Sequence, residues 1–197
     1  MKKSAARVLG VVAVLALSGC AINLPFNSRL SYQTVLDAEH LSAKSEGPIA
    51  IHWVPDTFPQ RIDTQGASGF VGGGSRTRIP TGVAIAGRVL EGLDSSVGVL
   101  DSAKKTLTIT VVRAETKFQY SAGFFNVTPA IDAGECTLEA SFAIGDKSWT
   151  QTFHYQLTDP KVGGTSQTAI LEKVWDNIAL QVVQNVVEHL RQGGAGG

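Results

Sequence analysis

The side chains of this chain that could hold a metal ion or act as nucleophiles are few. The two cysteines, Cys20 and Cys136, are too few for a thiolate cluster. Two histidines bind one metal ion most readily when they stand two to four residues apart, and no two histidines here have that spacing. The histidines are His40, His52, His154 and His189. We therefore expect no metal ion and no cofactor.

Serine and carboxylate patterns supply no catalytic group either. Residues 20–197 contain neither Gly-x-Ser-x-Gly nor Ser-x-x-Lys with its partner motifs, the patterns that place an activated serine. Glu135 and Glu139 share one face of a predicted strand, about 13 Å apart at about 3.3 Å per residue. That separation is too large for a pair of carboxyl groups in acid–base catalysis. We predict no catalytic residue and no enzymatic activity.

A glycine-rich stretch, residues 66–75, invites comparison with phosphate-binding loops. A P-loop requires a lysine after its second glycine, and no lysine lies between Lys44 and Lys104. The dinucleotide-binding pattern Gly-x-Gly-x-x-Gly, which stands between a strand and a helix, does not occur here either. We interpret the stretch as a loop, and we expect Phe70 and Val71 within it to contact a protein partner.

Aromatic side chains follow a predicted strand in the second half of the chain. Phe118 and Tyr120 end the strand, and Phe124 and Phe125 lie in the loop behind it. Two interpretations are about equally supported: the aromatic side chains anchor a partner, or they cover one end of the sheet core. We include Phe124 and Phe125 among the candidate partner contacts.

The first twenty residues have the features of an export signal. Three cations, Lys2, Lys3 and Arg7, precede an apolar run over residues 8–17, which is too short to cross a membrane comfortably. Leu17-Ser18-Gly19-Cys20 then resembles the lipobox of bacterial lipoproteins. The resemblance implies cleavage between Gly19 and Cys20 and acylation of the Cys20 thiol. The alternative is an ordinary signal peptide in which a cysteine happens to follow the cleavage site.

The residues after Cys20 indicate the membrane in which the protein is anchored. In the lipoprotein family an aspartate after the cysteine retains many members at the inner membrane, and Ala21 and Ile22 stand here instead. The resemblance therefore implies the outer membrane, with the protein facing the periplasm.

Composition limits the remaining function classes. Lys+Arg and Asp+Glu both number 17, and removal of the signal takes three cations, so the mature chain is mildly acidic. A nucleic-acid binder needs a basic face, and we therefore expect no nucleic acid as a partner.

Fewer than 180 of the 197 residues remain after removal of the signal, a length typical of one domain. With Cys20 acylated, Cys136 has no disulfide partner, and we expect it to be an inert core residue.

Periodicity predicts an α+β fold, a two-layer sandwich of a mostly antiparallel sheet covered by two helices. Strands with alternating apolar residues and helices with apolar residues three and four apart follow in the order β-α-β-β-β-α. The predicted strands are 48–54, 106–120, 135–144 and 149–157, and the predicted helices are 80–93 and 167–191. Gly145-Asp146 is typical of a tight hairpin.

These elements set the predicted organisation of the chain. We assign a signal peptide to residues 1–19, a lipidated N-terminus and tether with a short helix near 32–41 to 20–47, one periplasmic domain to 48–192, and a flexible glycine-rich tail to 193–197.

The order of elements, together with the lipobox, the strand Leu107-Thr108-Ile109-Thr110-Val111, the Gly145-Asp146 hairpin and the long last helix, resembles the YajG-type small outer-membrane lipoproteins over residues 48–191. Similar layouts occur in auxiliary lipoproteins of envelope transport machines. The resemblance implies a non-enzymatic structural or accessory subunit of a bacterial envelope assembly, anchored through Cys20. A periplasmic lipid-binding or lipid-transfer protein is the alternative, and a large apolar cavity between helices and sheet would favour it. Neither the partner nor the oligomeric state is predicted.

Overall fold

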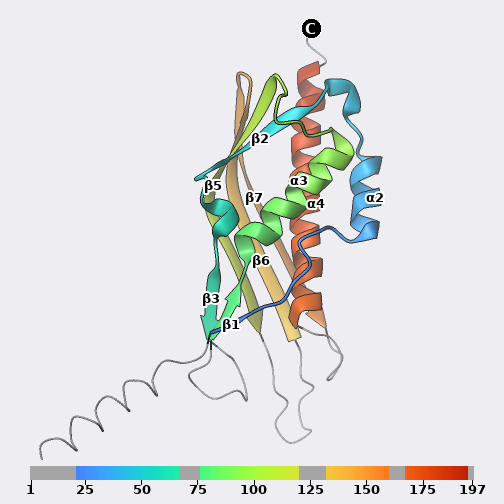
Figure 1. The fold of residues 1–197 in the computed structure, drawn as a ribbon. Coiled ribbons are helices and arrows are strands. Elements are labelled where there is room, and N and C mark those ends of the chain that lie inside the picture. The colour runs from blue at the N-terminus through green and yellow to red at the C-terminus, as the bar shows by residue number, and fades with distance from the viewer. Residues whose placement is uncertain (1–20, 67–75, 120–131, 160–166, 195–197) are drawn as a thin grey trace, which may run out of the picture.

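The main sheet has four strands in the order β2-β5-β6-β7, as a computed structural model of the chain shows for residues 21–66, 76–119, 132–159 and 167–194 (Figure 1). The strands are β2 (Ile49–Val54), β5 (Lys105–Gln119), β6 (Asp132–Ile144) and β7 (Lys147–Asp159). β2 pairs with β5 in parallel, and the other neighbours are antiparallel. The predicted α+β class and mostly antiparallel sheet are confirmed.

Helices cover one face of this sheet. α4 (Gln167–Gly194) lies against β6 and β7, and α3 (Thr81–Ser96) packs on α4 and reaches β5 (Figure 1). α2 (Tyr32–His40) packs outside them, on α3 and α4. Two single-turn 3-10 helices, η1 (Lys44–Glu46) and η2 (Phe58–Gln60), lie on either side of β2 along the chain. None of the described helices is long and apolar enough to cross a membrane.

A second, smaller sheet was not predicted. It has the order β1-β4-β3, with β1 (Ala21–Asn23) parallel to β4 (Arg76–Ile79) and β3 (Asp63–Gly66) antiparallel to β4. These strands are three or four residues long and mostly polar, so they lack the alternating apolar pattern from which a strand is recognised.

The prediction of a tether over residues 20–47 is corrected from residue 21 onward. β1 begins at Ala21, and the side chains of Leu24, Leu30 and Ala38 are buried in the core. The scattered apolar residues of this segment therefore fold onto the domain rather than leave it free. The short helix expected there is present as α2, while α4 extends to Gly194, two residues into the predicted tail.

The register of β5 against β6 shifts between Val111 and Arg113. Before this irregularity Leu107 is buried, and after it the buried positions are Ala114, Thr116 and Phe118. One extra residue moves every later side chain to the opposite face. Phe118 therefore points into the core, as the sheet-covering interpretation predicts for that residue.

The layer between α4 and the sheet is filled by side chains. Trp175, Ile178 and Val182 from α4 are fully buried in one cluster with Leu138 and Phe142 of the sheet. At the end of this layer the Trp149 ring stacks on His189, with centroids 4.1 Å apart, and the Trp149 indole donates to Asn185 Oδ1. Where α4 lies against β6 and β7, the layer is therefore packed with side chains from both elements.

Candidate docking groove on helix α3

A groove of about 670 Å³ runs along the outer side of α3. It is bounded by the segment that leads into α2 and by the turn that follows α3. The lining residues are Ser28, Arg29, Val83, Gly87, Leu90, Glu91, Asp94, Val99 and Asp101.

Apolar side chains remain exposed on this face of α3. Val83 and Leu90 are seven residues apart, two turns of helix, and are 40% and 45% exposed. The opposite face of the same helix carries Ile85, Val89 and Leu93, all fully buried in the core. An amphipathic helix normally presents polar residues to solvent, so the outer face of α3 has the composition of a contact surface.

Gly87 brings the N-terminal segment close to the helix. A Cβ atom at this position would lie 3.0 Å from the carbonyl oxygen of Ser28, which is closer than a side chain normally approaches. The other two glycines of α3 also lie against neighbouring elements: Gly82 lies against η2, and Gly92 lies against Val183 of α4.

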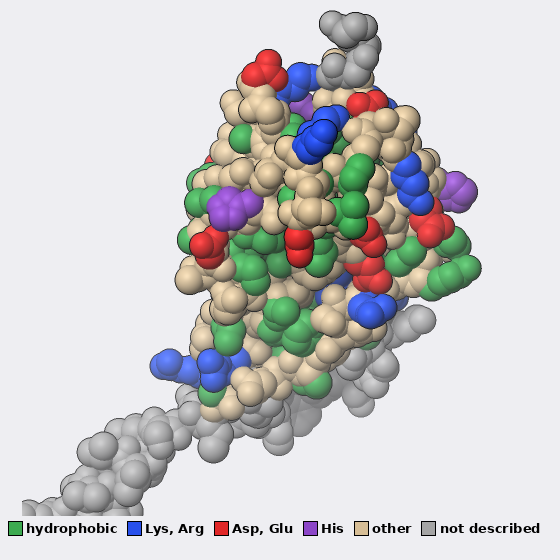
Figure 2. Space-filling view, turned by 45° about the horizontal axis from the view of Figure 1, so that its top comes forward, with side chains coloured by type: hydrophobic (Ala, Val, Ile, Leu, Met, Phe, Trp, Pro, Cys, Tyr) green, Lys and Arg blue, Asp and Glu red, His purple; other side chains and the backbone are tan. Residues whose placement is uncertain are grey.

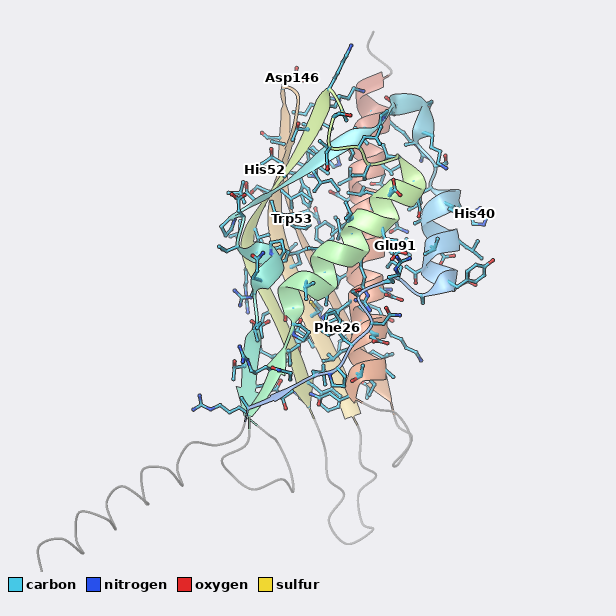
Figure 3. All side chains as sticks on the ribbon, viewed as in Figure 1. Phe26, His40, His52, Trp53, Glu91 and Asp146 are labelled. Atoms are coloured by element: carbon cyan, nitrogen blue, oxygen red, sulfur yellow. The ribbon has the colours of Figure 1, made fainter. Side chains whose placement is uncertain are left out.

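The groove is acidic. Glu91 Oε2 accepts a hydrogen bond from the backbone N–H of Leu30 (2.7 Å), and Asp94 Oδ1 accepts one from the backbone N–H of Val99 (2.9 Å). Figure 3 shows Glu91 between α3 and the segment that leads into α2. With Asp101, these carboxylates outnumber Arg29, the cation in the lining. Acidic and hydrophobic side chains also lie beside one another on the face drawn in Figure 2.

A buried ion pair behind the groove holds its wall in place. Arg88 Nε lies 2.8 Å from Asp176 Oδ1, and the two side chains are 1% and 11% exposed. Asp176 Oδ2 also accepts from the backbone N–H of Ser31 (3.0 Å) and the hydroxyl of Thr34 (3.3 Å). The guanidinium carbon of Arg88 lies 5.4 Å from the centre of the Trp175 ring, which adds a cation–π contact. The start of α2 is thus bound to α3 and α4 by one carboxylate.

This polar network continues into the sheet. The Trp175 indole donates to Thr116 Oγ1 (3.1 Å), and that hydroxyl donates to Cys136 Sγ (3.5 Å). Burial raises the pKa of Cys136 to about 12, because the thiolate would lie in an apolar interior. Cys136 is therefore an unreactive thiol, as the sequence predicts.

A second, polar pocket of about 390 Å³ lies between β3 and β5. Its acceptors are used within the protein: Asp63 Oδ2 accepts from the Thr81 hydroxyl (2.6 Å) and the Thr116 backbone N–H (2.9 Å). Gln65 likewise bonds both backbone groups of Phe118. These side chains join the small sheet to the edge of β5, and across the ranges described no cluster of His, Cys, Asp and Glu could hold a metal ion.

The predicted site residues are not among those that the structure describes. Gly19, Cys20, Phe70, Val71, Phe124 and Phe125 all lie outside the described residues. The sequence feature that marks the groove is a second pair of apolar residues on α3. Val83 and Leu90 lie on one side of the helix, and the other side carries Ile85, Val89 and Leu93. In the sequence this pattern is an ordinary apolar helix, because the exposed side is decided only by the elements that cover α3.

A scan against protein-family models finds no match, and a search of curated proteins finds none. Among solved structures, a Xanthomonas campestris protein of family DUF330 is similar with 13% identity, over 89% of this chain and 99% of that chain, at a TM-score of 0.48. A minor lipoprotein from Acinetobacter baumannii is similar with 10% identity, over 72% and 91%, at a TM-score of 0.40. The rare lipoprotein B from Shewanella oneidensis is similar with 10% identity, over 76% and 94%, at a TM-score of 0.33.

Proposed function

We propose that this protein is a non-enzymatic accessory subunit of a bacterial envelope assembly, anchored through acylated Cys20 to the periplasmic face of the outer membrane. The anchor is supported by the Leu17-Ser18-Gly19-Cys20 lipobox. The observation that carries the role is the groove on α3, where Val83 and Leu90 remain exposed while the other apolar side chains of the helix are buried. The protein acts by holding a partner at a fixed place near the membrane.

The chemistry of the groove defines the partner segment. Val83 and Asp94 are eleven residues apart, about 16 Å along the helix axis at 1.5 Å per residue. This length suits two to three turns of a partner helix. Exposed apolar side chains favour an apolar partner face, and the excess of carboxylates favours Lys or Arg beside it. The matching segment is amphipathic and basic.

The alternative of lipid transfer has less support. That function needs an apolar cavity between helices and sheet, and the described residues fill this layer with Trp175, Phe142 and their neighbours. The groove on α3 is open and bordered by carboxylates, which would repel phospholipid phosphates.

A site-specific crosslink in intact cells tests the docking role. A photoreactive amino acid replaces Leu90 in the full-length protein, and the matched control replaces Val112, an apolar residue on β5 that is 59% exposed. We expect one envelope protein to be captured at position 90 and not at 112. Capture is expected to fall several-fold when Asp101→Lys is added, because the substitution places a cation against a basic partner. Equal capture at both positions, or capture at 90 that Asp101→Lys leaves unchanged, would contradict the docking role.

The anchor is tested separately. Cys20→Ser is expected to release the protein from the envelope fraction and to change its electrophoretic mobility. A Cys20→Ser protein that stays membrane-bound at wild-type mobility would refute acylation.

A further inference from the structure

We propose that the outward face of the small sheet binds anionic phospholipid headgroups through Arg76 and Arg78, so that the domain stands directly on the membrane. The inference rests on the proposed anchor at Cys20 and adds to it an orientation and a lipid preference. It is carried by the pairing of β1 with β4 and by the exposure of the two arginines.

Strand register places the arginines beside the anchor. Ala21 pairs with Arg76 and Asn23 pairs with Arg78 in the parallel β1–β4 ladder. Neighbouring strands lie about 4.8 Å apart, and consecutive Cα atoms about 3.8 Å. The Cα atom of Arg76 is therefore within about 9 Å of the Cα atom of Cys20. The polar headgroup layer is about 5 to 7 Å thick on each side of a bilayer, so an acyl chain on Cys20 brings Arg76 to that layer.

No free linker separates the anchor from the domain. The backbone N–H of Leu24 donates to the carbonyl of Arg78 (3.1 Å), and the Leu24 side chain is buried. Ala21, the first residue of β1, follows Cys20 directly, and β1, β3 and β4 lie together at one end of the domain (Figure 1). An anchor at Cys20 turns that end toward the bilayer.

The two arginines are available to a ligand. Arg76 and Arg78 are exposed and two residues apart, so they share one face of β4, while Ile79 is buried. Among the described residues no carboxylate forms an ion pair with either guanidinium, whereas nearby Arg61 is paired with Asp63 at 2.9 Å. A guanidinium group binds a phosphate with two parallel hydrogen bonds, which makes a phospholipid headgroup the fitting ligand.

The membrane affinity that the two arginines add is measurable if the anchor itself binds weakly. Each basic residue at an anionic surface strengthens binding about five-fold, so two strengthen it about 30-fold. A single acyl chain gives reversible membrane binding with a constant of about 10⁴ M⁻¹. We therefore attach one acyl chain to the Cys20 thiol of the mature chain. The buried Cys136, whose pKa is raised to about 12, does not compete for the reagent.

Binding is measured to vesicles of phosphatidylcholine alone and of equal parts phosphatidylcholine and phosphatidylglycerol. The unaltered protein is expected to prefer the anionic vesicles about 30-fold, and Arg76→Gln with Arg78→Gln to lose most of that preference. The matched control is Lys104→Gln with Lys147→Gln, which removes the same charge at the opposite end of the sheet, where β5 and β7 begin. We expect the control to keep the preference.

An unchanged preference in the arginine variant, or an equal loss in both variants, would overturn the inference. Arg76→Lys with Arg78→Lys keeps the charge and loses only the paired guanidinium hydrogen bonds. It should therefore keep most of the charge-based preference, so a folding defect in the glutamine variant would not decide the outcome. Free phosphate at the same ionic strength as chloride is expected not to compete, which separates a headgroup surface from a phosphate site. Mass spectrometry of Cys20 in protein from envelopes tests acylation itself, so failure of the anchor and failure of the headgroup contact are distinguished.

Discussion

Removal of the Asp176 carboxylate charge is expected to destabilise the protein more than any exposed substitution. In Asp176→Asn the shape is kept, but Arg88 becomes a buried cation without a counter-ion. The amide has a single oxygen, so its N–H₂ group replaces either the acceptor of Arg88 or the acceptor of Ser31 and Thr34. Breaking a buried ion pair in this way costs about 3 to 5 kcal/mol. Of a total unfolding free energy of about 5 to 15 kcal/mol, that is a large share.

The assay is urea denaturation followed by tryptophan fluorescence, with Trp175 beside the pair as the reporter. Glu115→Gln is the matched control, because that carboxylate is paired with Arg113 at the surface and water can replace its partner. The double variant Arg88→Met with Asp176→Leu removes both charges, and we expect it to be more stable than Asp176→Asn.

Amide hydrogen exchange shows which element Asp176→Asn destabilises most. Because Asp176 binds the backbone N–H of Ser31, exchange in α2 is expected to accelerate in Asp176→Asn more than exchange in β6. A loss below about 1 kcal/mol, or a double variant less stable than the single one, would refute the view that one buried carboxylate holds the groove wall.

Three further substitutions test other parts of the packing. In Gly82→Ala the new Cβ would lie 1.9 Å from the carbonyl oxygen of Phe58, and we expect a loss of about 3 kcal/mol in thermal denaturation, because backbone must move. For Cys136 the folded thiol has a pKa of about 12 and the unfolded thiol one near 9.0, so the folded state keeps a proton that the unfolded state loses, and stability falls as pH rises from 9 to 12. At pH 10 the loss is about 1.4 kcal/mol, measured as the difference between the wild type and Cys136→Ala. Asp63→Ala removes the acceptor of the Thr116 N–H, and we expect about 2 kcal/mol of destabilisation with faster exchange at Thr116.

Each of these predictions has a result that contradicts it. Gly87→Ala is the control for Gly82→Ala, because its Cβ would meet one oxygen at 3.0 Å. Equal losses of stability in both variants would mean that the steric contact at Gly82 does not cause the destabilisation. Identical pH dependence of wild type and Cys136→Ala would show that the thiol titrates normally in the fold. Unchanged exchange at Thr116 in Asp63→Ala would show that β5 does not need the acceptor from β3.

The long elements were predictable because local periodicity and tertiary burial agree there. In β6 the buried positions Cys136, Leu138, Ala140 and Phe142 alternate with partly exposed ones, as a strand with one covered face requires. In α4 the buried residues recur at helical spacing over many turns. Local and global preferences coincide in both elements, so the pattern alone identifies them.

The small sheet and the N-terminal segment were not predictable in this way, because contacts between distant residues decide them. β3 is held to β5 by Asp63 and Gln65, each bonded to a residue 53 positions away, and polar side chains of this kind carry no periodic signal. The start of α2 depends on Asp176, which is 145 positions from Ser31. A sequence window around residues 21–47 contains none of these partners, and its own mixture of Asn, Ser, Pro and charged residues is typical of a linker.

The same long-range contacts change what the anchor can do. A tether would let the domain move over the membrane and reach partners in many orientations, whereas β1 begins at Ala21 and is paired with β4 at once. Acylated Cys20 would then fix the height and orientation of the whole domain, including the groove on α3. Inserting a flexible Gly-Ser linker between residues 20 and 21 is expected to keep membrane attachment but to reduce capture at Leu90 several-fold, because the groove would lose its fixed position. If capture were unchanged with the linker, orientation at the membrane would have no part in docking.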